Sequence, residues 1–273
     1  MRFQFLGTGA SEGFPGLFCN CNVCNEARHL GGKNLRLRSA LLVNDDLLVD
    51  FGPDLLAAAQ RLNLNLWKAR TGLVTHPHED HFSSDNFFLR PNPFGGGPQI
   101  PVMRLYGSKD VTTELAAKGL DLEKARLEIQ TVSAFESWQD NGYNFTAFRA
   151  YHAIDHLEAL FYSISDEKHA ILYATDTGYF PEETWQALQG RSFDAVVLEE
   201  TVGNGSYAQH LSFDTFLQVL GRIRASGMLR PGARVLAHHF SHSGNPLHED
   251  LNAFFAPHGV EAAYDGMEVV LPE

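Results

Sequence analysis

The chain has 273 residues, 44% of them hydrophobic, and a net charge of −12 from 33 acidic and 21 basic side chains. This content is sufficient for a sizeable core, and no run approaches the ~20 apolar residues of a membrane-spanning helix, so we expect a cytoplasmic protein without membrane partners. The acidic excess disfavours sequence-independent binding of nucleic acid, which relies on Lys and Arg to neutralise phosphates.

Short apolar segments and helical segments alternate along the N-terminal part of the chain. Residues 1–7 lack the long apolar stretch of a signal peptide and predict a first strand. Residues 36–43 and 46–50 predict two paired strands joined by a turn. Arg36 and Arg38 alternate with leucines, so we expect both to face solvent; a phosphate-binding role is the less favoured alternative.

The alternation continues without a repeat or a linker, so we expect one domain over residues 1–273. Residues 53–62 predict a helix with a proline near its start, and the apolar spacing of residues 212–224 predicts another. Three short runs predict strands that each end at a polar residue: 171–174, 195–198 and 234–237. Residues 91–98 hold too much Pro and Gly for regular structure and predict either a loop over the site or a solvated loop without a role.

The densest group of metal-binding side chains is the run His76-Pro77-His78-Glu79-Asp80-His81. It follows residues 71–75, an apolar stretch that predicts a buried strand, and open α/β proteins place ligands at the carboxyl ends of strands. Imidazole and carboxylate groups together suit Zn, Mn, Fe or Ni. Two ions need more than these four ligands, and later strand-like runs precede three further candidates: His152, Asp176 and His239.

Three cysteines within six residues, Cys19, Cys21 and Cys24, form a second cluster in a glycine-rich loop. Their odd number argues against a disulfide framework, and the asparagines around them argue against a packed core. Three thiolates in one short loop are a natural part of a tetrahedral zinc site with a histidine as the fourth ligand. We therefore expect a structural zinc at this loop.

The order of these residues resembles the metallo-β-lactamase superfamily of dinuclear hydrolases. The resemblance rests on His76-x-His78-x-Asp80-His81 followed by a lone His, an Asp and a late His. It extends to Asp50-Phe51-Gly52 and to Ala174-Thr175-Asp176-Thr177-Gly178, and so covers almost the whole chain. It implies an α/β fold, the four-layer αββα sandwich of the metallo-β-lactamase fold.

Carried over residue by residue, the resemblance implies two divalent ions (Zn, Mn or Ni) at the active site. Their ligands would be His76, His78 and His152 for the first ion, Asp80, His81 and His239 for the second, and Asp176 as the bridge. Asp50 would support the ligand loop from behind. His156 stays an alternative to His152, whereas the spacing to His242 selects His239 over the adjacent His238.

Within the superfamily, Gly7-Thr8-Gly9-Ala10 and the cysteine loop resemble the cyclic-phosphate phosphodiesterases of phosphonate breakdown. In that subfamily a late His-x-Ser-His gives one histidine to the catalytic pair and one to a structural zinc; here the stretch is His239-Phe240-Ser241-His242. The implied structural ligands are Cys19, Cys21, Cys24 and His242. His210 takes the place of a histidine that protonates the leaving group, unless it only begins a helix, and Asp80 could relay protons while it binds metal.

The resemblance implies a metal-dependent hydrolase, and we expect a phosphodiesterase that cleaves a small phosphodiester, cyclic or open, with a hydroxide that bridges the two ions. Hydrolysis of a thioester or lactone at the same site is an alternative. A metal-binding biosynthetic protein is another, because Gly13-Phe14-Pro15 before the cysteines resembles the pyrroloquinoline-quinone biosynthesis protein B. Transfer-RNA 3′-end processing is disfavoured by the acidic charge.

We expect a small phosphorylated substrate as the partner and no nucleic acid, and the resemblance implies a homodimer. Histidines without an assigned chemistry are expected at the surface: His29, His169, His248 and His258. No role is predicted for Glu199 or Glu200.

Overall fold

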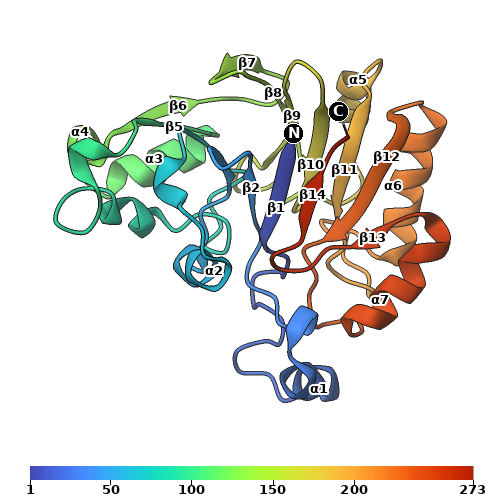
Figure 1. Ribbon diagram of the computed structural model, residues 1–273. Helices are drawn as coiled ribbons and strands as arrows, with labels where there is room; N and C mark the ends of the chain where they lie inside the picture. The colour runs from blue at the N-terminus through green and yellow to red at the C-terminus, as the bar shows by residue number, and fades with distance from the viewer. Residues whose placement is uncertain (273) are drawn as a thin grey trace.

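Two mixed β-sheets of seven strands each pack face to face at the centre of the protein (Figure 1). The structure is a computed structural model that describes residues 1–272. Across the first sheet, the strands are β14 (Glu268–Val270), β1 (Arg2–Gly7), β2 (Ala40–Val43), β3 (Leu47–Val49), β4 (Thr71–Leu73), β5 (Met103–Gly107) and β6 (Leu127–Thr131). Across the second sheet, they are β13 (Glu261–Ala262), β12 (Leu229–His238), β11 (Phe193–Glu199), β10 (Ala170–Ala174), β9 (Leu160–Ser165), β8 (Tyr143–Arg149) and β7 (Ser137–Asp140).

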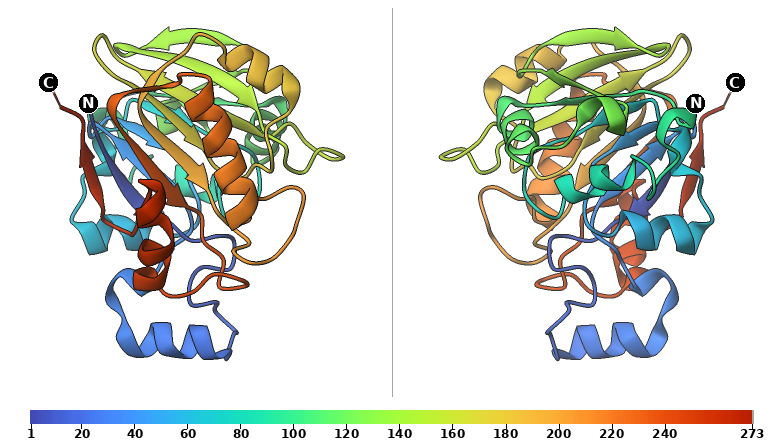
Figure 2. Two further views of the ribbon diagram at one scale, coloured as in Figure 1. Left: turned by 90° about the vertical axis from the view of Figure 1, so that its right-hand side faces the viewer. Right: turned by 90° about the vertical axis from the view of Figure 1, so that its left-hand side faces the viewer.

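Helices cover the outer face of each sheet and complete four layers (Figure 2). On the first sheet lie α2 (Leu55–Leu62), α3 (Lys109–Ala117) and α4 (Leu122–Ala125); on the second lie α5 (Glu182–Leu188), α6 (Phe213–Ala225) and α7 (His248–Phe255). α1 (Asn22–Leu30) lies at one end of the sandwich, and short 3₁₀ helices occupy connections: η1 (Gly32–Asn34), η2 (Leu66–Lys68), η3 (Ser84–Leu89), η4 (Gly97–Gln99) and η5 (Ala256–His258). The αββα sandwich expected from the sequence is confirmed. Within residues 1–272, no helix is both long and apolar enough to cross a membrane.

Side-chain alternation along the strands separates the apolar layers, because successive residues of a strand point to opposite faces of its sheet. In β10, Ile171 and Tyr173 join the core between the two sheets, whereas Leu172 and Ala174 join the core under the outer helices. All four are fully buried. The central strands of this sheet are therefore apolar on both faces and can carry polar groups only at their ends.

The two helices predicted from the sequence are present with slightly different ends. The helix predicted over residues 53–62 is α2, and the one predicted over residues 212–224 is α6. Ser212 caps α6 by accepting a hydrogen bond from the Thr215 N–H, which satisfies one of the free donors of the first turn.

The prediction that Arg36 faces solvent is wrong. Arg36 is only 3% exposed, and its guanidinium donates hydrogen bonds to Thr8 Oγ1 (2.8 Å) and to the Ala263 carbonyl (2.6 Å). Its Cζ lies 4.4 Å from the centroid of the Phe240 ring. Alternation with leucines is misleading here, because β2 begins only at Ala40 and the preceding segment forms isolated bridges instead of a strand with one solvent face.

Two histidines expected at the surface are also buried, His169 and His248. His169 Nε2 lies 2.7 Å from the Pro272 carbonyl oxygen, so it donates a hydrogen bond there. His248 Nδ1 lies 3.1 Å from Nη2 of Arg36 and accepts its hydrogen bond. Both side chains therefore complete polar networks that connect distant segments of the chain.

Asp265 gives the network around Arg36 a pH-dependent stability. Burial raises the pKa of Asp265 from 3.8 to about 6, despite hydrogen bonds from the Leu37 N–H and the Thr8 hydroxyl. The folded chain thus holds this proton more tightly than the unfolded chain does. The carboxyl contributes most stability below its ordinary pKa, and the contribution, about 3 kcal/mol, is lost as the pH rises through the folded value.

We expect the free energy of unfolding, taken relative to that of an Asp265→Asn variant, to fall by about 3 kcal/mol as the pH rises. The fall should lie between pH 3.8 and about pH 6. Denaturant unfolding of both proteins across this range measures the difference. A difference that stays constant with pH would contradict the expectation.

Candidate metal centres

Polar side chains gather at the edge where parallel strands of both sheets end. β3, β4 and β5 run parallel in the first sheet, and β10, β11 and β12 run parallel in the second. The chain leaving β4 carries His76, the chain leaving β10 carries Asp176, and the chain leaving β12 carries His239. This is the edge at which open α/β sheets bind ligands.

The first cluster contains His76, His78, His152 and Asp176, whose ligand atoms all lie within 4.8 Å of one another. Nε2 of His76 lies 2.9 Å from Nδ1 of His78 and 3.2 Å from Oδ2 of Asp176. Nε2 of His152 lies 3.1 Å from Nδ1 of His78. His156, the sequence alternative to His152, is exposed and lies outside the cluster.

The second cluster contains Asp80, His81, Asp176 and His239, again within 4.8 Å. Nε2 of His81 lies 3.1 Å from Oδ2 of Asp80 and 3.0 Å from Oδ2 of Asp176, and Nε2 of His239 lies 2.9 Å from Oδ1 of Asp176. Asp176 belongs to both clusters. The ring of the adjacent His238 packs away from them, against Phe5 and Tyr173.

The chemistry of these donors fits divalent metal ions. Three pairs of histidine ring nitrogens face each other at 2.9 to 3.2 Å. Only one nitrogen of each pair can carry the proton between them, so the other presents a lone pair. These lone pairs and the Asp176 carboxylate point into the same space. Burial lowers the pKa of His76 to about 3 and keeps its imidazole neutral, the form that binds metal. Nδ1 of His152 is buried without a hydrogen-bond partner within residues 1–272. Imidazole and carboxylate together select transition metals such as Zn or Mn.

Asp50 lies behind the loop that carries residues 76–81. Its carboxylate is fully buried, lies 2.7 Å from Nδ1 of His81 and accepts the Thr75 N–H at 2.8 Å. Asp50, Asp176 and His239 all have positive φ, at 66°, 45° and 62°. Such left-handed backbone is uncommon outside glycine and clusters at functional sites, where the surrounding structure enforces it.

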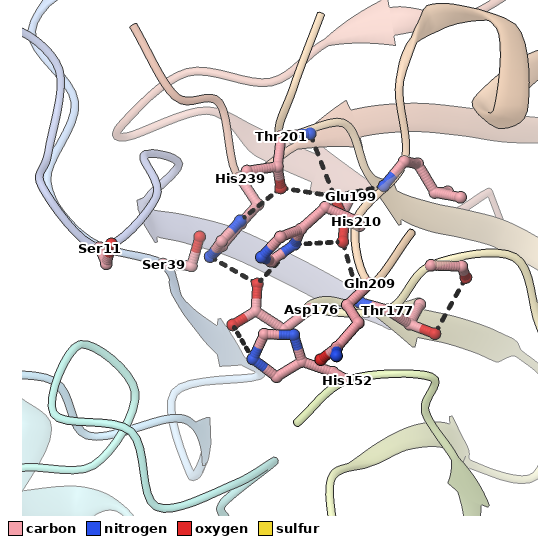
Figure 3. A network of polar contacts seen from close by, with 12 residues as sticks. Ser11, Ser39, His152, Asp176, Thr177, Glu199, Thr201, Gln209, His210 and His239 are labelled. Atoms are coloured by element: carbon pink, nitrogen blue, oxygen red, sulfur yellow. Dashed lines mark hydrogen bonds and ion pairs between the residues drawn. The ribbon is translucent and has the colours of Figure 1, made fainter. Parts of the chain in front are cut away.

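Glu199, at the end of β11, connects the second cluster to His210 (Figure 3). Its buried carboxylate accepts hydrogen bonds from His210 Nδ1 (2.8 Å) and from the Thr201 hydroxyl (2.5 Å). The Thr201 oxygen in turn lies 2.9 Å from Nδ1 of His239, which leaves Nε2 of His239 to face Asp176. The sequence patterns assign no role to Glu199; the signal that identifies it is its place directly after an apolar strand, like that of Asp176.

His210 lies beside the second cluster with one ring nitrogen fixed by Glu199. Its Nδ1 is 3.7 Å from Oδ1 of Asp176, and its ring stacks on that of His239 with centroids 5.9 Å apart. Burial disfavours the charged imidazolium, but the Glu199 carboxylate outweighs burial and raises the pKa of His210 to about 9. Glu199 therefore favours the protonated form of an imidazole that lies next to the candidate metal ligands.

A separate cluster contains Cys19, Cys21, Cys24 and His242, whose ligand atoms lie within 4.8 Å of one another. Cys24 is fully buried, which contradicts the expectation, drawn from the neighbouring asparagines, that the cysteines lie outside a packed core. The Sγ atoms of Cys19 and Cys21 lie 3.8 and 3.9 Å from Nδ1 of His242. The Cys24 N–H lowers the pKa of the Cys21 thiol to about 7, whereas burial raises the pKa of Cys24 to about 12. Burial thus favours the neutral Cys24 thiol when no cation is beside it. The donor set of three sulfurs and one nitrogen fits tetrahedral zinc.

Residues 46–240 match the β-lactamase superfamily domain, and this range contains every side chain of the two His/Asp clusters. The chain belongs to the metallo-β-lactamase superfamily of metal-dependent hydrolases. The superfamily resemblance drawn from the motifs is thereby confirmed, as is its metal-binding character.

Solved structures of metallo-β-lactamase fold cover the whole length of the chain. A diphosphatase from the PhnP family has a TM-score of 0.76 and 23% identity, covering 98% of this chain and 97% of that chain. Zinc-bound PqqB from Methylobacterium extorquens has a TM-score of 0.74 and 18% identity, covering 99% and 100%. The short form of human tRNase Z has a TM-score of 0.67 and 17% identity, covering 100% of both chains. At these identities the similarity shows the fold.

One curated relative matches a shorter stretch. Over 86 residues, or 30% of this chain, the sequence is 37% identical to part of an octanoyltransferase from Porphyromonas gingivalis. The matched stretch makes up only 16% of that protein's length.

Proposed function

We propose that residues 1–273 form one hydrolase domain that cleaves a small phosphodiester, cyclic or open, with the aid of two divalent ions. The observation that carries the choice of substrate is the position of His210, whose Nδ1 is held by the Glu199 carboxylate at 2.8 Å beside the clusters, an arrangement that stabilises the proton-donating form. An alkoxide leaving from phosphorus needs a proton. A thiolate leaving from a thioester does not, because its conjugate thiol has a pKa of only about 8.5. A dedicated acid thus favours an oxygen leaving group.

The two ions would be held by the His/Asp clusters, with Asp176 shared between them. The first ion would take His76, His78 and His152, and the second would take Asp80, His81 and His239. When bound, such ions supply Lewis-acid stabilisation of developing negative charge and lower the pKa of water. A further zinc would be held by Cys19, Cys21, Cys24 and His242 and would stabilise the fold.

The chain's own residues orient the ligands and move the proton. Asp50 and Thr201 each engage Nδ1 of a ligand histidine, His81 and His239 respectively, and so direct its Nε2 into the site. Glu199 holds Nδ1 of His210 in the same way, so the other nitrogen, Nε2, is the one that donates a proton to the leaving oxygen. Positioned acids of this kind contribute ~10²–10⁴-fold to rate.

Hydrolysis of an acyl thioester is the second candidate. The observation that favours it is the 86-residue stretch shared with an octanoyltransferase, an enzyme named for the transfer of an acyl group. This candidate leaves His210 without a necessary task when the leaving group is a thiolate, and we therefore rank it second.

A substrate panel with the metal-loaded protein tests the choice. The panel contains bis(p-nitrophenyl) phosphate, a cyclic nucleotide phosphodiester, S-lactoylglutathione and a β-lactam, with metal content measured on the same samples. We expect hydrolysis of the phosphodiesters and little of the others. Thioesterase activity without phosphodiesterase activity would reverse the ranking.

A further inference from the structure

A cavity of about 250 Å³ lies on the outer face of the first sheet, and its lining contains none of the metal ligands. Its walls come from α2, from η2, from η3 and from the residues near η4. The side chains that matter most are apolar: Leu55, Leu56, Trp67, Phe87 and Ile100. The right-hand view of Figure 2 faces this side of the molecule.

The glycine-rich segment, residues 91–98, builds one wall of this cavity. Gly95 and Gly96 line it directly. A Cβ atom on Gly95 would lie 2.3 Å from the Leu89 carbonyl oxygen, and one on Gly96 would lie 2.4 Å from Cγ2 of Ile100. The backbone must therefore approach these groups closely, which accounts for the composition of the segment. The segment lies against this cavity, whose lining contains none of the metal ligands. The prediction that residues 91–98 lack regular structure is wrong at their end, where η4 begins at Gly97.

Large apolar side chains remain exposed around the cavity. Leu56 is 60% exposed, Trp67 is 54% exposed and Leu89 is 51% exposed, and all three line it. Single exposed apolar residues are ordinary, but a contiguous group that surrounds a hollow marks a place where something apolar binds.

The cavity adjoins a hollow that carries three cations, called the basic mouth below. A second hollow, of about 640 Å³, shares Trp67 and Ile100 with the cavity and is lined by Lys68, Arg70 and Arg126. Arg70 lies near enough to Asp46 for its charge to act on that carboxyl, and Nε of Arg126 donates a hydrogen bond to the Ile100 carbonyl at 2.7 Å. No carboxylate oxygen lies within 4.0 Å of a charged nitrogen of these three cations within residues 1–272.

The acidic groups of the second hollow have other partners. Asp45 pairs with Arg2 at 2.6 Å, and Asp46 accepts the Tyr143 hydroxyl at 2.7 Å. On a chain with a net charge of −12, a hollow whose three cations outnumber its two carboxylates is a local exception. It complements an anionic group placed at the end of an apolar chain.

We propose that this cavity and its basic mouth bind a linear medium-chain aliphatic carboxylate. The alkyl chain lies among Leu55, Leu56 and Phe87, and the carboxylate lies against Lys68 and Arg70. The volume exceeds the ~150 Å³ of a cavity that takes up benzene and falls below the ~300 Å³ at which pockets for drug-sized molecules begin. That size suits a short flexible chain. The site is separate from the metal centres and does not depend on the function proposed above.

Titration with straight-chain carboxylates from butanoate to dodecanoate, kept below their micelle concentrations, tests the proposal. Trp67 lines both hollows and provides a fluorescence signal that a Trp67→Phe variant should abolish. Each added CH₂ group should tighten binding about fourfold until the chain fills the cavity, after which affinity should level off. Affinity that is independent of chain length would overturn the proposal.

Variants separate the apolar and the charged parts of the site. Leu56→Asp should abolish binding, whereas Val270→Asp, a matched change at a residue 62% exposed on β14, should leave it intact. Lys68→Glu combined with Arg70→Glu should weaken carboxylates but not the corresponding alcohols. If alkyltrimethylammonium ions bind as tightly as carboxylates of the same chain length, the ligand's head group need not be anionic and the proposal fails. If the native protein binds no carboxylate and forms a dimer that Leu56→Asp dissociates, the cavity is instead the contact surface for a second copy of the chain.

Discussion

Replacing His210 by alanine is expected to lower kcat for an alkyl phosphodiester by ~10²–10⁴-fold, with the content of bound metal unchanged. His210 is not among the ligands of the two His/Asp clusters, and Glu199 fixes its Nδ1 at 2.8 Å. Its loss removes the proton donor and leaves the ligands in place. Steady-state kinetics and metal analysis on the same preparations measure both quantities.

Leaving-group chemistry makes the His210 experiment specific. A p-nitrophenolate leaves without needing a proton, so the loss of kcat should be much smaller for bis(p-nitrophenyl) phosphate than for a cyclic nucleotide. Glu199→Gln should produce an intermediate loss, because it keeps the shape but removes the charge that raises the pKa of His210. His156→Ala, at an exposed histidine, is the matched control and should change nothing. Equal losses for both leaving groups would remove His210 from proton transfer.

Replacing Cys21 by serine is expected to release about one equivalent of zinc and to lower Tm by roughly 10 °C or more. Cys21 is exposed, so its substitution disturbs little packing, and the loss should come from the metal. Structural zinc contributes its binding free energy to folding because the unfolded chain has no preformed site. Metal analysis and thermal unfolding together measure the effect.

The neighbouring residue supplies the control for the zinc experiment. Asn20→Ser introduces the same side chain at an exposed position of the same loop and should preserve both zinc and Tm. Unchanged zinc content in Cys21→Ser would disprove the assignment of a metal to the cysteine cluster.

The residues of the two His/Asp clusters could be predicted from the sequence because several are close together in the chain and the others follow in the order that the family resemblance implies. The run from His76 to His81 is dense enough to stand out by itself, and single residues after apolar strands complete it in a fixed order along the chain. The structure brings these side chains within 4.8 Å of their partners. The four-layer sandwich was predicted only through the family resemblance that these motifs carry, and the structure confirms it.

The supporting residues could not be predicted, because their roles exist only through contacts between distant segments. Arg36 is surrounded by Thr8, Ala263 and Phe240, and no local pattern distinguishes it from an exposed cation on a strand. The positive φ of His239 is equally invisible in the sequence. It costs roughly 1–3 kcal/mol and persists because the packed strand ends enforce it.

The chain order of the ligands has a consequence for the order of assembly. His242 is 221 residues after Cys21, and His239 is 158 residues after His81. His242 follows His239 by three positions, so the cysteine cluster and the second His/Asp cluster are completed almost together, after all their other members have been synthesised. A nascent chain that lacks them carries only the first cluster, which is complete once Asp176 is present. A partly synthesised chain therefore lacks the second His/Asp cluster until β12, which precedes His239, has been made.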